Sequence, residues 1–140
     1  MKKITVSAAI ILNNNEILCV QRAKNKYPYI SEKFEFPGGK IETGESEQEA
    51  LLREIKEELN LEIKIERKFL VVSHQYPDFK LEMHSYLCTC SKRDLTLHEH
   101  IAEKWLAISK LEALDWAAAD IPIVHKLVQE NNGNTPFTIR

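Results

Sequence analysis

Two segments rich in apolar and β-branched residues open the chain, with a short polar stretch between them. They span residues 3–12 and 16–21, and three consecutive asparagines at 13–15 separate them. Asparagine tolerates the left-handed backbone of a tight turn, so this pattern predicts a β-hairpin. A turn is also expected at residues 37–39, Pro-Gly-Gly. Further strands are predicted at residues 34–36, 61–73, 80–90 and 103–108.

Capping signals mark where the main helix should begin. Ser46 followed by Glu49 forms a capping box, which predicts a helix that runs to about Leu59. At about 100° per residue, the apolar side chains of this helix fall on one stripe, which is the expected buried face. The stripe consists of Leu51, Leu52, Ile55 and Leu59.

Two further helices are predicted nearer the end of the chain. Ser109 with Glu112 should open a short helix. Asp120 can cap a last helix that reaches roughly Glu130, with Gly133 behind its end. Strands of several lengths combined with two substantial helices predict an α/β fold, a sandwich with a mixed β-sheet.

The composition indicates one ordinary globular domain. Of 140 residues, 44% are hydrophobic and 29% charged, which is typical of a folded chain with a real core. We expect a single domain over residues 1–131 and a C-terminal tail over 132–140. No apolar run approaches the ~20 residues of a membrane helix. The formal net charge of −2 lacks the basic excess of a nucleic-acid-coating protein. We therefore expect a cytoplasmic protein, a monomer or homodimer, that binds neither membrane nor nucleic acid.

Negative charge is concentrated in one stretch of this otherwise balanced chain. Residues 36–62 hold eight carboxylates and three basic side chains. On the predicted helix, Glu54 and Glu58 border the apolar stripe, where burial and mutual repulsion raise carboxylate pKa values unless a cation compensates. Mg²⁺ is a natural compensator because it takes hard oxygen ligands. The alternative is a solvated helix on which Arg53 pairs with Glu57 one turn away.

The spacing of these residues follows a longer pattern. The stretch GKIETGESEQEALLREIKEELNL resembles the Nudix box, G-x5-E-x7-R-E-U-x-E-E-x-G-U with U apolar, and it matches eight of the nine specified positions. The exception is Asn60, where the family usually has glycine. Asparagine is the next-best residue for the left-handed conformation that ends a helix, so we expect the fold to be unaffected.

The resemblance implies a hydrolase of nucleoside diphosphates linked to another moiety. It implies the Nudix fold, an α/β/α sandwich with a mixed β-sheet, and Mg²⁺ or Mn²⁺ as the cofactor. Carried over position by position, Glu54, Glu57 and Glu58 are the metal ligands, helped by the carbonyl of Gly38. Because a polyphosphate is itself negatively charged, carboxylates can approach it only through bridging cations.

Further catalytic roles follow from the same resemblance. Arg53 would hold a glutamate of the box in place, with Glu45 as the first choice. Glu54 is the first candidate for the general base. Glu99 is the second, and it can instead complete the metal shell. Two histidines flank Glu99, but a His-x-His pair on a loop or strand is weak support for metal ligation.

The resemblance covers about residues 1–130 and extends to two groups of triphosphate hydrolases. FEFPGGKIE at 34–42 and YPD at 76–78 resemble the MutT-type 8-oxo-dGTP pyrophosphohydrolases. SHQ at 73–75 and ADIP at 119–122 resemble the bacterial CTP pyrophosphohydrolases. Both groups convert a nucleoside triphosphate into a monophosphate and pyrophosphate. The implied role is removal of damaged or unwanted nucleotides.

Four residues are candidates for substrate binding, each with a structural alternative. Arg22 matches a position that helps to hold the phosphates, or it is an exposed arginine at a strand end. Asp120 matches the position of a base-reading asparagine, or it caps the last helix. As an aspartate it favours a base with an amino donor, such as cytosine, or requires a raised pKa. Phe36 and Tyr76 can stack on the base or pack in the core.

Two other functions remain open from the sequence. The same kind of enzyme can act on a nucleotide sugar, a dinucleoside polyphosphate or capped RNA, although no extra motif for these substrates follows the box. A non-catalytic Nudix module that senses oxidised guanine in DNA is the second alternative. It predicts eroded box carboxylates and a basic face, whereas this chain keeps the carboxylates and is slightly acidic.

Overall fold

The computed structural model describes residues 1–131 and 137–139. Its centre is a seven-stranded sheet of order β3-β2-β1-β6-β5, in which β4 also pairs with β1 and β7 with β2. Strands β1 and β6 are parallel and the other pairs are antiparallel, so the sheet is mixed, as predicted. The strands are β1 (Lys3–Asn13), β2 (Glu16–Gln21), β3 (Phe34–Glu35), β4 (Gly38–Lys40), β5 (Lys64–Gln75), β6 (Lys80–Thr89) and β7 (Ala102–Leu106).

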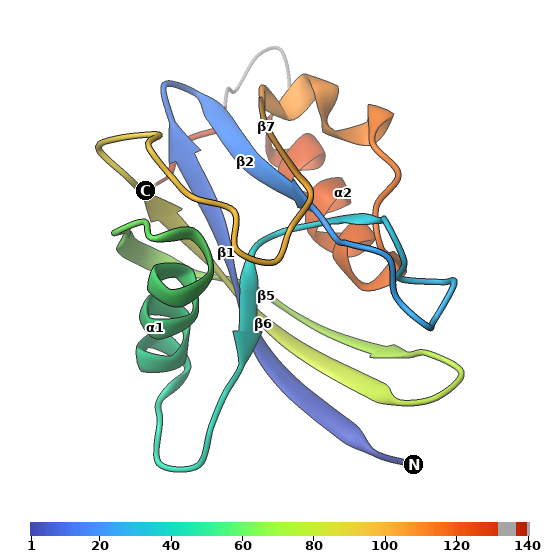
Figure 1. The fold of residues 1–140 in the computed structure, drawn as a ribbon. Coiled ribbons are helices and arrows are strands. Elements are labelled where there is room, and N and C mark those ends of the chain that lie inside the picture. Colours follow the sequence, from blue (N-terminus) through green and yellow to red (C-terminus); the bar gives the residue numbers. More distant parts are fainter. Residues whose placement is uncertain (132–136, 140) are drawn as a thin grey trace.

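Two α-helices lie on opposite faces of the sheet, which gives the α/β/α sandwich (Figure 1). They are α1 (Glu47–Leu59) and α2 (Ile121–Glu130), and the short 3-10 helices η1 (Ile108–Ala113) and η2 (Ala118–Asp120) precede α2. The predicted fold class is confirmed. No helix within the described residues is long and apolar enough to span a membrane.

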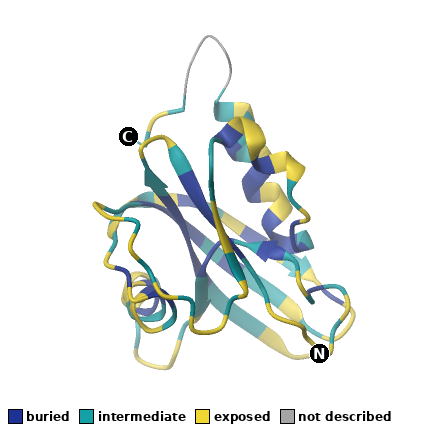
Figure 2. Ribbon diagram, turned by 45° about the horizontal axis from the view of Figure 1, so that its top comes forward, coloured by how far each residue is buried: buried dark blue, intermediate teal, exposed yellow. Residues whose placement is uncertain are grey.

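Alternate residues of β1 face the two helices, because successive side chains of a strand point to opposite faces. Ile11 belongs to the core cluster that contains Leu51 of α1. Its neighbour Ile10 belongs to the cluster that contains Leu127 of α2. Burial is accordingly greatest in the central strands and on the helix faces turned toward them (Figure 2).

Helix α1 begins and ends as predicted, but its buried face is narrower. Ser46 Oγ accepts the N–H of Glu49, and the Glu49 carboxylate accepts the N–H of Ser46. Asn60 has the left-handed φ of 51° that ends the helix. Leu52 is 45% exposed, because it lies at the outer edge of the apolar stripe, beyond the part that contacts the sheet. The buried residues of the helix are Ala50, Leu51, Ile55 and Leu59.

Three other local predictions need correction. Residues 37–39 do not form a turn, because both glycines pair with β1 as part of β4. The strand predicted at 61–73 is displaced toward the C-terminus, since β5 spans Lys64–Gln75. Ser109 lies inside η1 and does not cap it. The predicted helix end at Gly133 lies outside the described residues.

The described part of the C-terminal segment contacts β5. The rings of Phe137 and Phe69 meet edge to face, with centroids 6.3 Å apart. The Nε of Arg67 donates to the carbonyl of Ile139 at 3.3 Å. These contacts place residues 137–139 against the sheet, while a domain boundary at residue 131 stays a prediction.

Candidate active site

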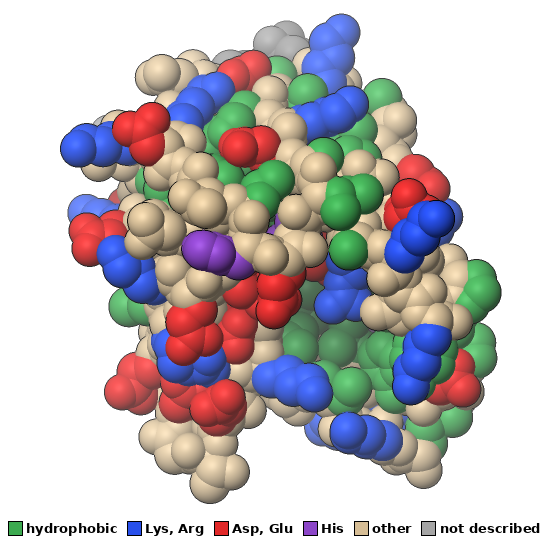
Figure 3. All heavy atoms as spheres, viewed as in Figure 1, with side chains coloured by type: hydrophobic (Ala, Val, Ile, Leu, Met, Phe, Trp, Pro, Cys, Tyr) green, Lys and Arg blue, Asp and Glu red, His purple; other side chains and the backbone are tan. Residues whose placement is uncertain are grey.

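A pocket of about 960 Å³ lies beside α1 and β1. Figure 3 shows acidic side chains gathered next to a hollow with a hydrophobic floor, and Lys and Arg side chains around it. Arg53 is not part of this lining and contacts the acidic side chains from the side of α1. The other residues predicted for the site all line the pocket: Arg22, Phe36, Gly38, Glu54, Glu57, Glu58, Tyr76, Glu99 and Asp120.

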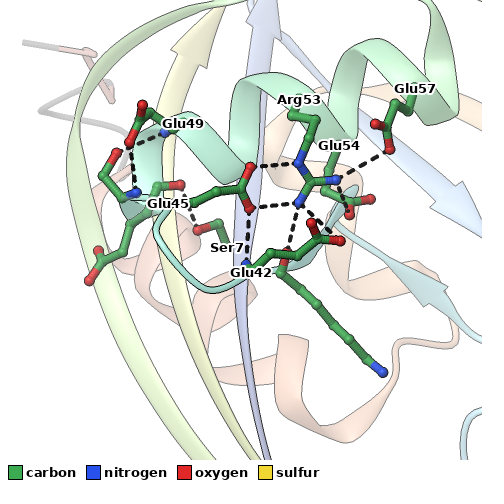
Figure 4. A network of polar contacts seen from close by, with 10 residues as sticks. Ser7, Glu42, Glu45, Glu49, Arg53, Glu54 and Glu57 are labelled. Carbon is green, nitrogen blue, oxygen red and sulfur yellow. Dashed lines mark hydrogen bonds and ion pairs between the residues drawn. The ribbon is translucent and has the colours of Figure 1, made fainter.

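Arg53 connects the acidic side chains around α1 (Figure 4). Its Nε and Nη2 donate to the two carboxylate oxygens of Glu45 at 2.6 and 2.8 Å, which is the contact expected from the sequence. Its Nη1 donates to Glu54 at 2.9 Å and to Glu57 at 3.2 Å. The contact with Glu57, one turn away, is the ion pair expected if α1 were an ordinary solvated helix. Arg53 therefore makes this contact as well as the expected contact with Glu45.

Glu45 is a carboxylate that the protein itself neutralises. Hydrogen bonds from Arg53 lower its pKa to about 2, helped by the backbone N–H of Glu42, which donates to it at 3.0 Å. The bidentate geometry fixes both partners, because two parallel N–H···O bonds leave the guanidinium little freedom. Arg53 is therefore held in place for its contacts with Glu54 and Glu57.

Glu58 has the opposite environment. Burial raises its pKa to about 8, and the negative charges of Glu54 and Glu99 contribute to the rise. The groups that act on this carboxylate most strongly are thus other carboxylates and not cations. Within the pocket, the chain leaves negative charges close together and partly desolvated, which costs stability unless a cation joins them.

These carboxylates fit a hard divalent cation by the chemistry of their donor atoms. Glu54, Glu58 and Glu99 all contribute oxygens to one pocket, and a cation there would remove their repulsion. Among the described residues, no three His, Cys, Asp or Glu side chains are already arranged to hold a metal ion. Glu54 and Glu57 are bound to Arg53 instead. The fit to a metal ion therefore rests on the kind of ligand atoms, carboxylate oxygens, and not on an arrangement that already matches a metal site.

Two glycines allow close approach at the wall of the pocket. A Cβ at Gly38 would collide with the carbonyl oxygen of Ser7 in β1. A Cβ at Gly39 would collide with the carboxylate group of Glu54. The backbone of β1 thus leaves no room for a side chain at Gly38, and Gly39 leaves the room in which the Glu54 side chain lies.

Asp120 is a buried carboxyl group in the pocket wall. It is 5% exposed, and its Oδ1 accepts the backbone N–H of Phe36 at 3.0 Å. Burial raises its pKa well above the usual range, and the charge of Glu35 adds to the rise. Although Asp120 occupies the position before α2, its side chain makes no capping hydrogen bond. The interpretation of this side chain as a helix cap is therefore wrong.

The two predicted aromatic residues are part of the core as well as of the pocket wall. Phe36 stacks on Trp116 at a centroid distance of 4.7 Å, and Tyr76 stacks on Tyr29 at 5.1 Å. The hydroxyl of Tyr76 also accepts the N–H of Ala119 at 3.0 Å. Because these rings are already stacked and nearly fully buried, they form an apolar wall whose position is fixed.

Several residues of the site were not predicted from the sequence. Glu35 lines the pocket, with its Oε1 3.2 Å from Nε of Arg22 and its Oε2 2.9 Å from Nε2 of His100. The available signal was a charged residue between two phenylalanines in a short strand. His100 has its partner 65 positions away, so no local pattern indicates the contact. Lys24 and Lys26 also line the pocket, from a loop without a recognisable motif.

Known proteins are similar to this chain in both sequence and fold. The NUDIX domain family matches residues 1–127 of the chain. The chain belongs to the Nudix family. Gly39 of β4 and helix α1 with Glu54, Glu57 and Glu58 lie within the matched residues and make up the stretch that resembles the Nudix box.

Two curated Nudix relatives come from Escherichia coli. Its 8-oxo-dGTP diphosphatase is 32% identical over 128 residues, covering 91% of this chain and 98% of the relative. Its CTP pyrophosphohydrolase is 36% identical over 129 residues, covering 89% and 90%. The solution structure of MutT from methicillin-resistant Staphylococcus aureus is 41% identical, with a TM-score of 0.72 over 93% of this chain and 99% of that one. This MutT-like Nudix protein is a hydrolase of phosphorus-containing acid anhydrides.

Proposed function

We propose that this Nudix hydrolase is a divalent-metal-dependent nucleoside triphosphate pyrophosphohydrolase that sanitises the nucleotide pool. Its substrates are 8-oxo-dGTP, or CTP, dCTP and modified pyrimidine triphosphates. The observation that carries the proposal is the pocket, in which an acidic cluster and Arg22 adjoin an apolar wall with one buried carboxyl, Asp120. Such a pocket separates a polyphosphate end from a base end.

The acidic cluster supplies the metal site of this proposal. Glu54, Glu57, Glu58 and Glu99, with the carbonyl of Gly38, would hold Mg²⁺ or Mn²⁺. When bound, such an ion neutralises phosphate oxygens and lowers the pKa of a bound water. The raised pKa of Glu58 supports this assignment, because a site built for a cation is electrostatically costly without one.

Two residues move the proton and hold the phosphates. Glu54 accepts the proton of the attacking water through its carboxylate, and its contact with Arg53 orients that carboxylate. Water adds to a phosphorus of the anhydride and the bridging P–O bond breaks, which leaves a monophosphate and pyrophosphate. Glu99 remains the second candidate for the base. Arg22 lines the same pocket with a side chain that is 42% exposed, so it can reach the phosphates.

Asp120 is proposed to read the base. Its Oδ1 is occupied by the Phe36 N–H, so the other carboxyl oxygen is the one that can meet a base edge. When ionised, that oxygen accepts from an amino donor such as N4 of cytosine. The raised pKa also supports a neutral carboxyl, which can donate as well as accept and thus suits the edge of 8-oxoguanine.

The test is pyrophosphate release with Mg²⁺ across a panel of substrates. The panel contains 8-oxo-dGTP, dGTP, CTP, dCTP, 5-methyl-dCTP and one nucleotide sugar, and Glu54→Gln serves as the inactive control. We expect the wild-type protein to hydrolyse a triphosphate, with kcat lowered about 10²–10⁴-fold in the variant. Preference for 8-oxo-dGTP would indicate that Asp120 reads a purine, and preference for CTP or dCTP that it reads cytosine. Preference for the nucleotide sugar, or an unaffected variant, would contradict the proposal.

A further inference from the structure

His100, Glu35 and Arg22 meet where three neighbouring strands come together. Strand β2 pairs with β3 on one side and with β7 on the other. Arg22 directly follows β2, Glu35 is the last residue of β3, and His100 precedes β7. Gln21 pairs with Phe34 of β3 and with Ala102 of β7, so all three residues lie at the same end of the sheet.

Glu35 divides its two carboxylate oxygens between the other two residues. Its Oε2 lies 2.9 Å from Nε2 of His100, and its Oε1 lies 3.2 Å from Nε of Arg22. Because an ionised carboxylate only accepts, Nε2 of His100 must carry the proton of this contact. Pairing through Nε leaves both terminal amino groups of Arg22 without a hydrogen bond to the described residues. These groups are the ones that a phosphate can bind.

His100 is poorly suited to a purely structural role. Its side chain is only 6% exposed, and its Nδ1 is buried without a hydrogen-bond partner among the described residues. An unpaired buried acceptor destabilises a protein, so an apolar residue would fill this space better. The histidine has one polar contact that explains its presence, which is the one with Glu35.

We propose that His100 is a positioning residue for substrate binding. It fixes Glu35, and Glu35 in turn holds the Arg22 guanidinium so that its two terminal amino groups face the phosphates. The inference rests on the proposed function, since phosphate binding by Arg22 is part of that function. The inference adds a series of contacts from His100, which lies outside the Nudix box, through Glu35 and Arg22 to the triphosphate.

The test compares His100→Leu with His100→Gln and with Arg22→Ala in the full-length protein. The measurements are KM and kcat for CTP and 8-oxo-dGTP, the Kd of α,β-methylene-CTP, the Mg²⁺ concentration at half-maximal rate, and Tm. For His100→Leu we expect KM and Kd to rise about 10-fold, as for other residues that orient a binding group. We expect kcat and the Mg²⁺ requirement to stay within about twofold, and Tm to be unchanged or higher. Glutamine can donate to Glu35 and should restore most of the affinity.

The double variant Arg22→Ala with His100→Leu tests whether His100 affects substrate binding through Arg22. If His100 acts through Arg22, the double variant should bind no more weakly than Arg22→Ala alone. Additive losses would contradict the inference, and so would a lower Tm with an unchanged KM. A changed Mg²⁺ requirement would show instead that His100 acts through its neighbour Glu99. A wild-type protein without triphosphatase activity would contradict the proposed function, and the analogue Kd would then still test the role of His100.

Discussion

Carboxylates at the two ends of α1 have opposite electrostatic environments. Near its start, Glu45 has a pKa lowered to about 2 by hydrogen bonds from Arg53. The pKa of Glu47 is also lowered: burial alone would raise it, but hydrogen bonds from Lys68 and Tyr86 outweigh that effect. At the pocket, burial and neighbouring carboxylates raise the pKa of Glu58 to about 8.

This difference in pKa separates the carboxylates that stabilise the fold from those that are proposed to bind a ligand. Glu47 receives the Nζ of Lys68 at 2.7 Å and the hydroxyl of Tyr86 at 2.5 Å, and these contacts fasten the start of α1 to β5 and β6. Among the described residues, no lysine or arginine forms an ion pair with Glu58. The chain therefore supplies cations where carboxylates anchor the helix, whereas the charges that act most strongly on Glu58 are those of other carboxylates.

The largest effect is expected from replacing one pocket carboxylate, Glu58, and one anchoring carboxylate, Glu47, by their amides. Glu58→Gln should lower kcat/KM at least about 100-fold, because loss of a residue that merely supports a ligand already costs about 10–100-fold. Its Tm in EDTA should be unchanged or higher, since the variant removes repulsion. Steady-state pyrophosphate release and thermal unfolding measure both quantities.

Glu47→Gln is the matched control on the same helix. It should lower Tm, because it weakens the contacts with Lys68 and Tyr86, and leave kcat/KM within about threefold. Two results would contradict this difference between the anchoring and the pocket carboxylates. One is a loss of stability in Glu58→Gln in EDTA, and the other is a loss of activity in Glu47→Gln as severe as in Glu58→Gln.

A smaller effect is expected where the backbone makes room for the acidic cluster. The added Cβ of Gly39→Ala would collide with the side chain of Glu54 and displace it. A misplacement of about 1 Å can reduce catalysis about 100-fold, so we expect a fall in kcat of that order. Stability should change little, because the displaced group is the end of a flexible side chain.

Gly44→Ala separates this steric effect from a backbone effect. Gly44 has a φ of +87° and open space around it. The variant should lower the free energy of unfolding by about 1 kcal/mol through strain and leave kcat unchanged. Equal kcat in Gly39→Ala and the wild-type protein would show that Glu54 does not need its observed position.

Local sequence signals predicted much of the fold and the acidic helix. Ser46 and Asn60 bound α1 as expected, since caps depend on residues next to them in the chain. The periodicity placed Leu52 at the edge of the buried stripe but could not say how far the sheet extends beneath it. The strand β4 was missed because glycines have no side chains to alternate between faces.

The motif indicated box residues that line the pocket, and it gave no signal for residues that only the fold brings there. Asp120 has a helical backbone, with φ −85° and ψ −19°, whereas a residue that caps with its side chain usually has extended angles. Its side chain therefore bonds to Phe36, 84 positions away. The contact between Glu35 and His100 was not predicted for the same reason, because only the pairing of β3, β2 and β7 brings them together.

The smallest effect that distinguishes the carboxylates near the start of α1 from those at the pocket is a change of stability with pH. The pKa of Glu45 is lowered in the folded state, so its contribution is present above its ordinary pKa of 4.5 and is lost as the pH falls toward about 2. The pKa of Glu58 is raised, so its contribution has the opposite sign. It is fully present below pH 4.5 and is lost as the pH rises through about 8. In EDTA, Tm should therefore be highest near pH 5 and fall toward pH 8.

Mg²⁺ identifies the pocket as the source of the alkaline decline. A cation bound between Glu54, Glu58 and Glu99 favours their ionised forms, so saturating Mg²⁺ should raise Tm more at pH 8 than at pH 5. Glu58→Gln should flatten the decline in EDTA without any metal, whereas Glu47→Gln should keep it. If the decline persisted unchanged in Glu58→Gln, it would arise from other groups, and the acidic cluster would not be the electrostatic cost that a metal ion relieves.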